Sequence, residues 1–366
     1  IMKRNLYLKT IPPAEAVARV KASIDCEALI REETLPSHEA SGRVLAHAVH
    51  ARYSSPTFHS AAMDGYAVNA RSTFAAREGH PLTLKAGETC FAVNTGHPMP
   101  EGCDAVIMIE QVVLDGGSVT IEAPAFPWQH VRRIGEDIVA TELLFPRNHQ
   151  LRPWDVGALL SGGIWDVPVW ERVTVRIIPT GDEVLDFTTH PDPGKGQVVE
   201  SNSQMLAALA RELGCVVERA APVPDNPEAL HQALKDSLDA GRHLTIFCAG
   251  SSAGSKDFTR ATLEKEGEIL THGIAAMPGK PSLLANCRGR LVAGAPGYPV
   301  SALVCFKELL EPLISWLSHR EPPAKTVVPV ELTRTVPSRP GVEEHVRVSI
   351  GRVGDKLVAT PLGRGA

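Results

Sequence analysis

Five charged side chains stand in short segments rich in small residues: Asp64 in HSAAMDGYAVN, Asp182 and Glu183 in PTGDEV, Asp257 in AGSSAGSKD, and Lys280 in MPGKPS. Glycine lets backbone amides approach a ligand, and hydroxyls and helix N-termini supply donors, so such segments can cradle a phosphate or another oxyanion. Lys280 would add a positive charge. Carboxylates suit such a site only when a divalent cation or a transferable proton lies between them and the anion. The residue types therefore favour phosphate chemistry assisted by Mg²⁺.

Each of these residues also has a simpler structural explanation. Asp182 could cap a turn and Asp257 a helix N-terminus, since aspartate is favoured at both places. Asp64 could satisfy the backbone of its own turn, or Gly65 could allow a turn that aims its carboxylate outward. Lys280 could be a solvated surface lysine. The functional interpretation gains weight only if several of the segments meet in space.

Residues 172–320 show the alternation of strands and helices that is typical of a doubly wound, mostly parallel sheet. The expected strands are VTVRIIP, CVVERAAPV, HLTIFCAG, EILTHGIA and RLVAGAP, and the region ends with one long helix, PVSALVCFKELLEPLISWLS. Ligands bind such sheets beyond the carboxyl ends of the strands. The segments expected at that edge are Pro179–Val184, Ser201–Asn202, Ala249–Asp257, Met277–Ser282 and Ala295–Ala302.

The remaining sequence predicts further domains, because 366 residues exceed the roughly 250–300 at which a single core stops growing. Residues 1–53 and 138–171 are expected to form a mixed connecting domain, which begins with apolar residues at helical spacing: Ala14, Val17, Ala18, Ile24, Ala28 and Leu29. Short β-like runs separated by turn residues in 54–137 predict a small inserted β domain. Residues 321–366 predict a C-terminal β domain that is truncated before it could close.

Composition excludes several classes of protein. The chain has 43% hydrophobic residues and a net charge of -5, which argue for a globular protein without a broad basic face for nucleic acid. No apolar run approaches the roughly 20 residues that span a bilayer, so no membrane partner is expected. Seven scattered cysteines without a C-x-x-C pair fit a reducing compartment, and we expect a cytoplasmic location.

Seven motifs in order along nearly the whole chain resemble those of the MoeA-type molybdopterin molybdenumtransferases, the family that includes the E domain of gephyrin. They are SAAMDGYAV, NTGHPMPEGCDAVIMIEQ, VRRIGEDI, PTGDEV, AGSSAGSKDF, PGKP and APGYPVS. The resemblance implies insertion of molybdate into adenylylated molybdopterin, with hydrolysis of the adenylate, release of AMP and assistance from Mg²⁺. It also implies an elongated homodimer of multidomain α/β and β subunits. Each subunit would have a connecting domain, an inserted β domain, a MogA-like three-layer α/β domain and a C-terminal β barrel.

The resemblance also implies a site between the α/β domain of one subunit and the inserted β domain of the other. The positions that match functional residues of the family are Asp64, Thr95, Asp137, Glu183, Asp225, Asp257 and Lys280. Catalysis is assigned to Asp64, Asp137, Glu183, Asp257 and Lys280, with Asp64, Glu183 and Asp257 as ligands of Mg²⁺ or molybdate. Substrate binding is assigned to Thr95, Thr180, Gly181, Asp182, Ser201, Asn202, Asp225, Gly250, Ser251, Ser252, Gly254, Pro278, Gly279, Pro281, Gly297, Pro299 and Ser301.

The chain departs from the family pattern at five positions around the same site. Met277 replaces a second lysine, which removes part of the positive charge expected there. The other departures are Ala249 for glycine, Phe258 for tyrosine, Tyr298 for asparagine, and Glu200 for the aspartate of D-S-N. Two alternatives therefore remain: a non-catalytic protein that binds molybdopterin or acts as a scaffold, and a paralogous transferase that uses tungstate, a tetrahedral dianion of nearly the same size as molybdate.

Overall fold

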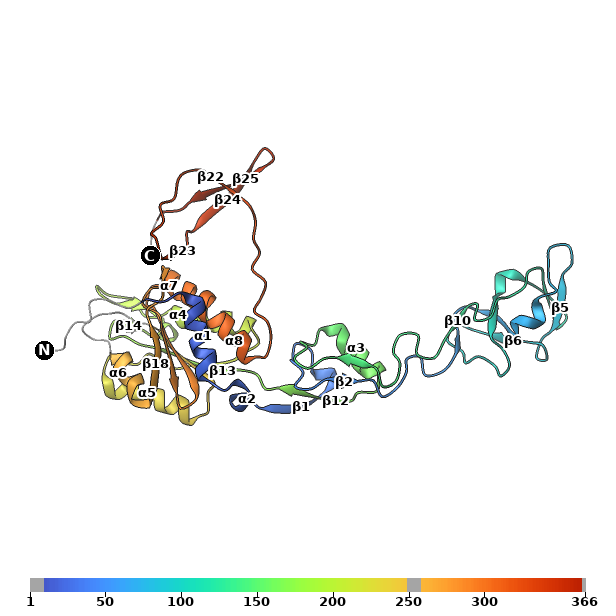
Figure 1. Ribbon diagram of the computed structural model, residues 1–366, viewed down its shortest axis with the longest axis horizontal. Coiled ribbons are helices and arrows are strands. Elements are labelled where there is room, and N and C mark those ends of the chain that lie inside the picture. The colour runs from blue at the N-terminus through green and yellow to red at the C-terminus, as the bar shows by residue number, and fades with distance from the viewer. Residues whose placement is uncertain (1–9, 249–257, 364–366) are drawn as a thin grey trace. The chain divides into compact units, whose positions relative to one another are not determined.

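The computed structural model describes residues 10–248 and 258–363, and the chain divides into two compact units (Figure 1). One unit contains residues up to Glu33 together with Trp170 and the rest of the chain; the other contains Thr34–Val169. The predicted loop Ala249–Asp257 lies outside the described residues. None of the described helices is long and apolar enough to cross a membrane.

A six-stranded sheet with the order β16-β13-β17-β21-β20-β18 forms the centre of the first unit. Its strands are β13 (Thr174–Pro179), β16 (Val216–Arg219), β17 (Leu244–Cys248), β18 (Gly267–His272), β20 (Leu283–Cys287) and β21 (Arg290–Ala295). The first four in spatial order are parallel, as the sequence predicted. Strand β20 runs antiparallel to both of its neighbours, β21 and β18, so the sheet is mixed.

Strand β20 was missing from the expected strands. Its hairpin with β21 closes through only Arg288 and Gly289, which both have positive φ, at 52° and 76°. A two-residue turn of this kind matches the twist of antiparallel strands. The hairpin places one antiparallel strand, β20, between β21 and the edge strand β18.

Helices cover both faces of this sheet, which gives the three layers expected from the sequence (Figure 1). On one face, α5 (Pro227–Asp239) and α6 (Phe258–Glu266) pack over a core that contains Ile178, Leu234, Phe247, Leu263 and Val292. On the other face lie α1 (Pro13–Ser23), α4 (Asn202–Glu212), α7 (Pro299–Cys305) and α8 (Glu311–Leu317).

The long helix expected at residues 299–318 is interrupted by a π turn, η5 (Phe306–Leu310), between α7 and α8. Pro312 follows this turn. A proline has no N–H to donate, and its ring clashes with the carbonyl four residues earlier, so the helix widens just before it. The helical prediction is confirmed, but regular α-helical geometry is not maintained throughout.

Helix α1 packs in the α/β unit, against β20 and the helix made of η5 and α8. Helix α1 thus belongs to the unit that contains the six-stranded sheet, whereas residues 34–53 belong to the other unit. Of the apolar residues expected on one face, Ile24 is buried, but Ala14 and Ala18 are exposed. Ala16 and Val20, which were not among them, are buried in α1.

The second unit contains two short antiparallel sheets and several two-stranded ladders. One sheet has the order β6-β4-β7 and the other β5-β9-β8. Their strands are β4 (Gly65–Val68), β5 (Leu82–Lys85), β6 (Cys90–Val93), β7 (Ala105–Met108), β8 (Val112–Asp115) and β9 (Ser118–Ile121). The paired short strands are β1 (Glu32–Pro36) with β12 (Asp166–Trp170), β2 (Val49–His50) with β11 (Leu143–Phe145), and β3 (Ser60–Ala61) with β10 (Val131–Arg132).

Separate groups of buried side chains lie within this unit. One, with Val68, Leu84, Cys90, Ile107 and Val119, belongs to the two β sheets. Another joins residues that precede the two β sheets in sequence to residues that follow them. Residues 40–49 pack with residues 145–169, which include helix α3 (Pro153–Ser161). Residues far apart in sequence therefore share the core around α3.

Helix α3 begins with a capping box centred on Asp155. The buried carboxylate accepts hydrogen bonds from the backbone and guanidinium of Arg152 and lies 2.7 Å from His149 Nε2. Burial by itself raises the pKa of Asp155, but the hydrogen bonds from Arg152 and His149 outweigh it and lower the pKa to about 2. The carboxylate is thus ionised at neutral pH.

The effect of Asp155 on stability should depend on acidic pH. Its folded pKa is below the unfolded value of about 3.9, so its contribution is present above that value and lost as pH falls toward 2. Asp155→Asn should lower the free energy of unfolding by on the order of 2 kcal/mol at pH 6. Denaturant unfolding between pH 6 and pH 3 should show the variant and wild type converging. A difference independent of pH, or an equal effect of Asp115→Asn at an exposed site, would contradict the assignment.

Residues 321–363 contain four short strands: β22 (Glu331–Leu332), β23 (Glu343–Glu344), β24 (Val348–Val353) and β25 (Lys356–Pro361). Three of them form a sheet with the order β22-β25-β24, and β23 pairs with β19 (Ala276–Met277). These described strands do not close into a barrel. The C-terminal segment does, however, hold Met277, directly before the PGKP segment.

Candidate functional site

The segment after β13 is fixed to two neighbouring parts of the sheet edge. The amide and hydroxyl of Thr180 both donate to the carbonyl of Cys248, at 2.9 and 3.1 Å, and the amide of Gly181 donates to Val223. Thr180 is buried, so its side chain holds strand ends together. Gly181 has φ of 138°, and a Cβ there would lie 2.7 Å from Val184 Cγ2 and 3.0 Å from Glu183 Oε1. Glycine therefore leaves room for the Glu183 side chain, which is exposed.

Asp182 links this segment to Asp225. Its Oδ1 accepts a hydrogen bond of 3.0 Å from the Asp225 amide. Asp225 does not cap the helix that follows it, because Asn226 caps α5 by accepting from the amide of Ala229. The backbone of Asp225 is thereby held next to Asp182 at the edge of the sheet.

Asn202, at the start of α4, connects a second pair of predicted segments. Its Nδ2 donates to the carbonyl of Gly297 at 2.7 Å, which joins Ser201–Asn202 to the segment before α7. Ser201 occupies the N-cap but its side chain makes no capping bond. The Oδ1 of Asn202 is buried and has no hydrogen-bond partner among the residues that the structure describes. This atom is an acceptor that a ligand could use.

The PGKP segment reaches the same edge because β20 runs antiparallel to β21. Leu283 at the start of β20 pairs with Gly294 near the end of β21. Gly279 has φ of 113° and packs against α7, where a Cβ would lie 3.2 Å from Val304 Cγ1. Ser282 fixes the turn by donating to the Gly279 carbonyl at 2.7 Å, and the side chain of Lys280 is exposed.

The structure thus brings together four of the five predicted segments, including Pro278, Pro281, Pro299 and Ser301 within them. The fifth contains Gly250, Ser251, Ser252, Gly254 and Asp257, which all lie outside the described residues. It begins immediately after β17, a parallel strand between β13 and β21. Phe258, at the family's tyrosine position, starts α6 and packs on the core.

Asp64 and Thr95 form a pair in the other unit. The amide and hydroxyl of Thr95 donate to Asp64 Oδ1 at 2.7 and 3.1 Å. The backbone hydrogen bond is the main reason that the pKa of Asp64 lies below its usual value, so this exposed carboxylate is ionised. Asp64 does not simply satisfy its own turn, because its partner is 31 residues away.

Gly65 has φ of 156°, and close packing gives a further reason for a glycine here. A Cβ at this position would overlap the carbonyl oxygen of Ile107 on the neighbouring strand β7. Glycine is needed for this close approach of two strands, which places Asp64 at the start of β4. Asp137 is exposed in the same unit and donates its amide to the Ser55 carbonyl.

The carboxylates at the sheet edge suit a Mg²⁺ ion that a substrate phosphate also binds. Asp182, Glu183 and Asp225 offer carboxylate oxygens, the ligands that Mg²⁺ prefers. Within the described ranges, no group of three or more acidic, histidine or cysteine side chains could hold a metal ion alone. Mg²⁺ is commonly bound by one or two carboxylates together with substrate phosphates, so the residues fit an ion that arrives with a phosphorylated ligand.

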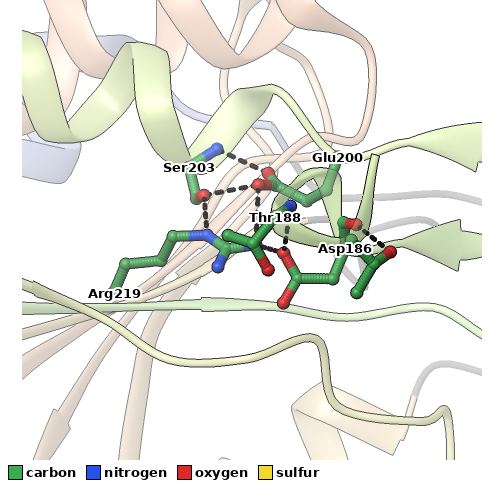
Figure 2. A network of polar contacts seen from close by, with 6 residues as sticks. Asp186, Thr188, Glu200, Ser203 and Arg219 are labelled. Atoms are coloured by element: carbon green, nitrogen blue, oxygen red, sulfur yellow. Dashed lines mark hydrogen bonds and ion pairs between the residues drawn. The ribbon is translucent and has the colours of Figure 1, made fainter. Parts of the chain in front are cut away.

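A group of polar residues beside the site was missed by sequence reasoning. Arg219 contacts Asp186, Glu200 and Ser203 (Figure 2). Glu200 was noted only as a departure from D-S-N. Arg219 is the last residue of β16, so the rule that selected the other segments, polar residues at the carboxyl ends of strands, could have identified it.

Comparisons with known proteins support the same interpretation. Residues 11–163 match the family described as MoeA N-terminal region (domain I and II), and residues 176–316 match the probable molybdopterin binding domain. A structure of the molybdopterin biosynthesis MoeA protein from Pyrococcus horikoshii is similar with a TM-score of 0.79 and 28% identity, covering 97% of this chain and 90% of that one.

Curated relatives are similar over most of the chain. The molybdopterin molybdenumtransferase of Haemophilus influenzae is 34% identical over 79% of this chain and 74% of that protein. The molybdopterin molybdenumtransferase of Synechococcus elongatus is 32% identical over 77% of this chain and 74% of that protein. With both domain matches and these relatives, the chain belongs to the molybdopterin molybdenumtransferase family of molybdenum cofactor biosynthesis.

Proposed function

We propose that this protein inserts molybdate into adenylylated molybdopterin and releases AMP. The observation that carries the proposal is the meeting of four segments at one sheet edge, held by the contacts Thr180–Cys248, Asp182–Asp225 and Asn202–Gly297. Exposed Lys280 and Glu183 lie in these segments. Amides, an amide side chain and a lysine suit phosphate, while the carboxylates suit metal and proton transfer.

Hydrolysis of the adenylate breaks the phosphoanhydride bond between AMP and molybdopterin phosphate. An oxygen of water forms the new bond to the AMP phosphorus, and a carboxylate accepts the proton of that water. In this proposal Asp64, Glu183 and Asp257 would hold Mg²⁺ or molybdate, and Mg²⁺ bound there would neutralise the negative charge that develops on the phosphate oxygens. Asp137 assists. Lys280 binds phosphate. Thr95 fixes Asp64 through its two hydrogen bonds.

We further propose that the active form is a cytoplasmic homodimer with the inserted β domain, residues 54–137, completing the site of the partner chain. The catalytic candidates divide between the two units: Asp64 and Asp137 in one, Glu183 and Lys280 in the other. A site shared between two chains explains why an inserted domain carries an ionised, exposed aspartate. All seven cysteines are free thiols, in keeping with a reducing compartment.

The deciding experiment incubates the purified protein with adenylylated molybdopterin, Mg²⁺ and either molybdate or tungstate, and follows AMP. Release that requires molybdate supports the proposal. Release with tungstate alone would favour the tungstate transferase. Tight binding without AMP release would favour the non-catalytic scaffold.

Lys280→Ala should weaken binding of the adenylylated substrate by roughly 1–3 kcal/mol, the range for losing a hydrogen bond to a charged group. Calorimetric titration at constant ionic strength can measure this loss. Lys235→Ala, which removes an exposed lysine from α5, is the matched control and should leave binding unchanged. Equal affinity of the Lys280 variant and wild type would contradict the role in phosphate binding.

A further inference from the structure

Arg219 makes polar contacts with three side chains next to the candidate site (Figure 2). Its Nε donates to Ser203 Oγ at 2.9 Å, and its Nη2 lies 3.1 Å from Asp186 Oδ1 and 3.4 Å from Glu200 Oε2. The guanidinium also stacks over the Phe187 ring, 4.6 Å from its centre. The side chains of Arg219 and Glu200 are only 13% and 4% exposed, so these contacts are shielded from solvent.

Three of these partners, Asp186, Phe187 and Glu200, belong to one segment, residues 183–202, which leaves the sheet after β13 and leads into α4. Strand β14 (Val184–Leu185) pairs with β15 (Val198–Val199) across its base. The amide of Val198 donates to Glu183, and that of Glu200 to Leu185, both at 2.9 Å. The placement of Glu183 therefore depends on this base remaining closed.

Glu200 connects the segment 183–202 to helix α4. Its Oε1 accepts from the amide of Ser203 at 2.7 Å, and its Oε2 accepts from the Ser203 hydroxyl at 2.6 Å. It thus provides the capping contacts that Ser201 does not make. Asn202 lies between Glu200 and Ser203 and reaches Gly297, so its position follows from that of Glu200.

We propose that Arg219 is a positioning residue, which holds the segment 183–202 closed and thereby places Glu183 and Asn202 for the reaction. It reaches Asp186 near the start of the segment and Glu200 near its end. Two carboxylates facing each other without Arg219 would repel, and the buried Glu200 would lose its cation. The catalytic part of this inference rests on the proposed function; the closure of the segment does not.

The test compares Arg219→Met with Arg242→Met in the full-length protein. Arg242 precedes β17, at the amino end of that strand, and its Nη2 pairs with Glu218 at 2.9 Å, so its replacement also removes one paired arginine. Hydrogen exchange should rise at least about tenfold for the amides of Val198, Glu200 and Ser203 in the Arg219 variant, because a charged hydrogen-bond network is lost. Exchange within β17 and β21 should change little, and Arg242→Met should not affect the segment.

The activity measurement separates positioning from stability. In Arg219→Met, kcat for AMP release should fall at least about tenfold, with a smaller change in KM, at a temperature where the protein stays folded. Adding Glu200→Gln to Arg219→Met should recover part of the lost protection from hydrogen exchange, because glutamine leaves no unpaired charge at position 200. Arg219→Lys, which keeps the charge but cannot reach Ser203 and both carboxylates in one planar geometry, should give an intermediate result.

Unchanged exchange of residues 183–203 in Arg219→Met would overturn the proposal. Raised exchange with unchanged kcat would equally overturn the positioning role. If Arg219→Met fails to fold, the same comparisons apply to Arg219→Lys, for which wild-type exchange and kcat together would overturn the proposal. If the wild-type protein released no AMP, the proposed function would fail, and the exchange result alone would decide whether Arg219 holds this segment.

Discussion

Replacement of Asp64 by asparagine is expected to slow AMP release by at least about 10²-fold, the lower range for losing a general acid or base. The carboxylate is ionised and exposed, and Thr95 fixes its Oδ1. An asparagine oxygen can accept the same two hydrogen bonds from Thr95, so the local fold should be retained. Substrate affinity should change little, because asparagine keeps the shape of the side chain and its hydrogen bonds to Thr95. Single-turnover kinetics with saturating substrate measure this effect.

Two further variants control for structural damage. Asp104→Asn alters a carboxylate of the same unit that accepts the Ala70 amide at 2.7 Å, and its AMP release should stay near the wild-type rate. Asp64→Ala also loses the contacts with Thr95 and should be both slower and less stable than wild type. AMP release at the wild-type rate by Asp64→Asn would make this carboxylate structural and favour the scaffold function.

Mixing two inactive variants tests whether the site is shared between chains. Asp64→Asn and Glu183→Gln alter different units of the protein. If each site takes Asp64 from one chain and Glu183 from its partner, a mixed dimer has one intact site. Random exchange of subunits should then restore about a quarter of wild-type activity, since half of the dimers are mixed. A mixture that stays inactive after subunit exchange, or a protein that is monomeric during turnover, would contradict the shared site.

Gly65→Ala is expected to destabilise the unit formed by Thr34–Val169 by more than about 3 kcal/mol, since overpacking and backbone strain act together. The added Cβ would overlap the carbonyl oxygen of Ile107, so strands β4 and β7 would have to separate. A backbone atom on a paired strand cannot move aside as a flexible side chain would. Thermal unfolding, with hydrogen exchange of β4 and β7 as the local probe, should show the loss.

Gly102→Ala provides the matched control within the same unit. Gly102 also has positive φ, at 80°, but a Cβ there would meet no atom within 4 Å. It should cost only about 1–2 kcal/mol, the strain of a left-handed backbone for a residue with a side chain. Equal effects of the two substitutions would show that backbone conformation, and not the approach of Ile107, makes Gly65 necessary.

Local sequence patterns determined much of this protein. Alternation of strands and helices predicted the layers of the α/β unit. Burial of one helix face and of both sheet faces produces a regular pattern of apolar residues in the sequence. The rule that ligand segments follow the carboxyl ends of parallel strands selected the four described segments around Thr180, Asn202, Gly279 and Gly297. The ordered motifs predicted the family, which the comparisons confirmed.

Tertiary structure decided the features that depend on contacts between distant residues. Periodicity places α1 but does not identify its partner or fix which apolar row is buried, and the sheet selected Ala16 and Val20. Asp225 reads as a helix cap until Asn226 is seen to fill that role. Arg219 is separated by 33 residues from Asp186 and by 16 from Ser203, and no local pattern records that pairing. Local sequence encodes burial and turns because each residue carries its own preference, whereas a hydrogen bond between remote segments exists only once the chain has brought both partners to the same edge of the sheet.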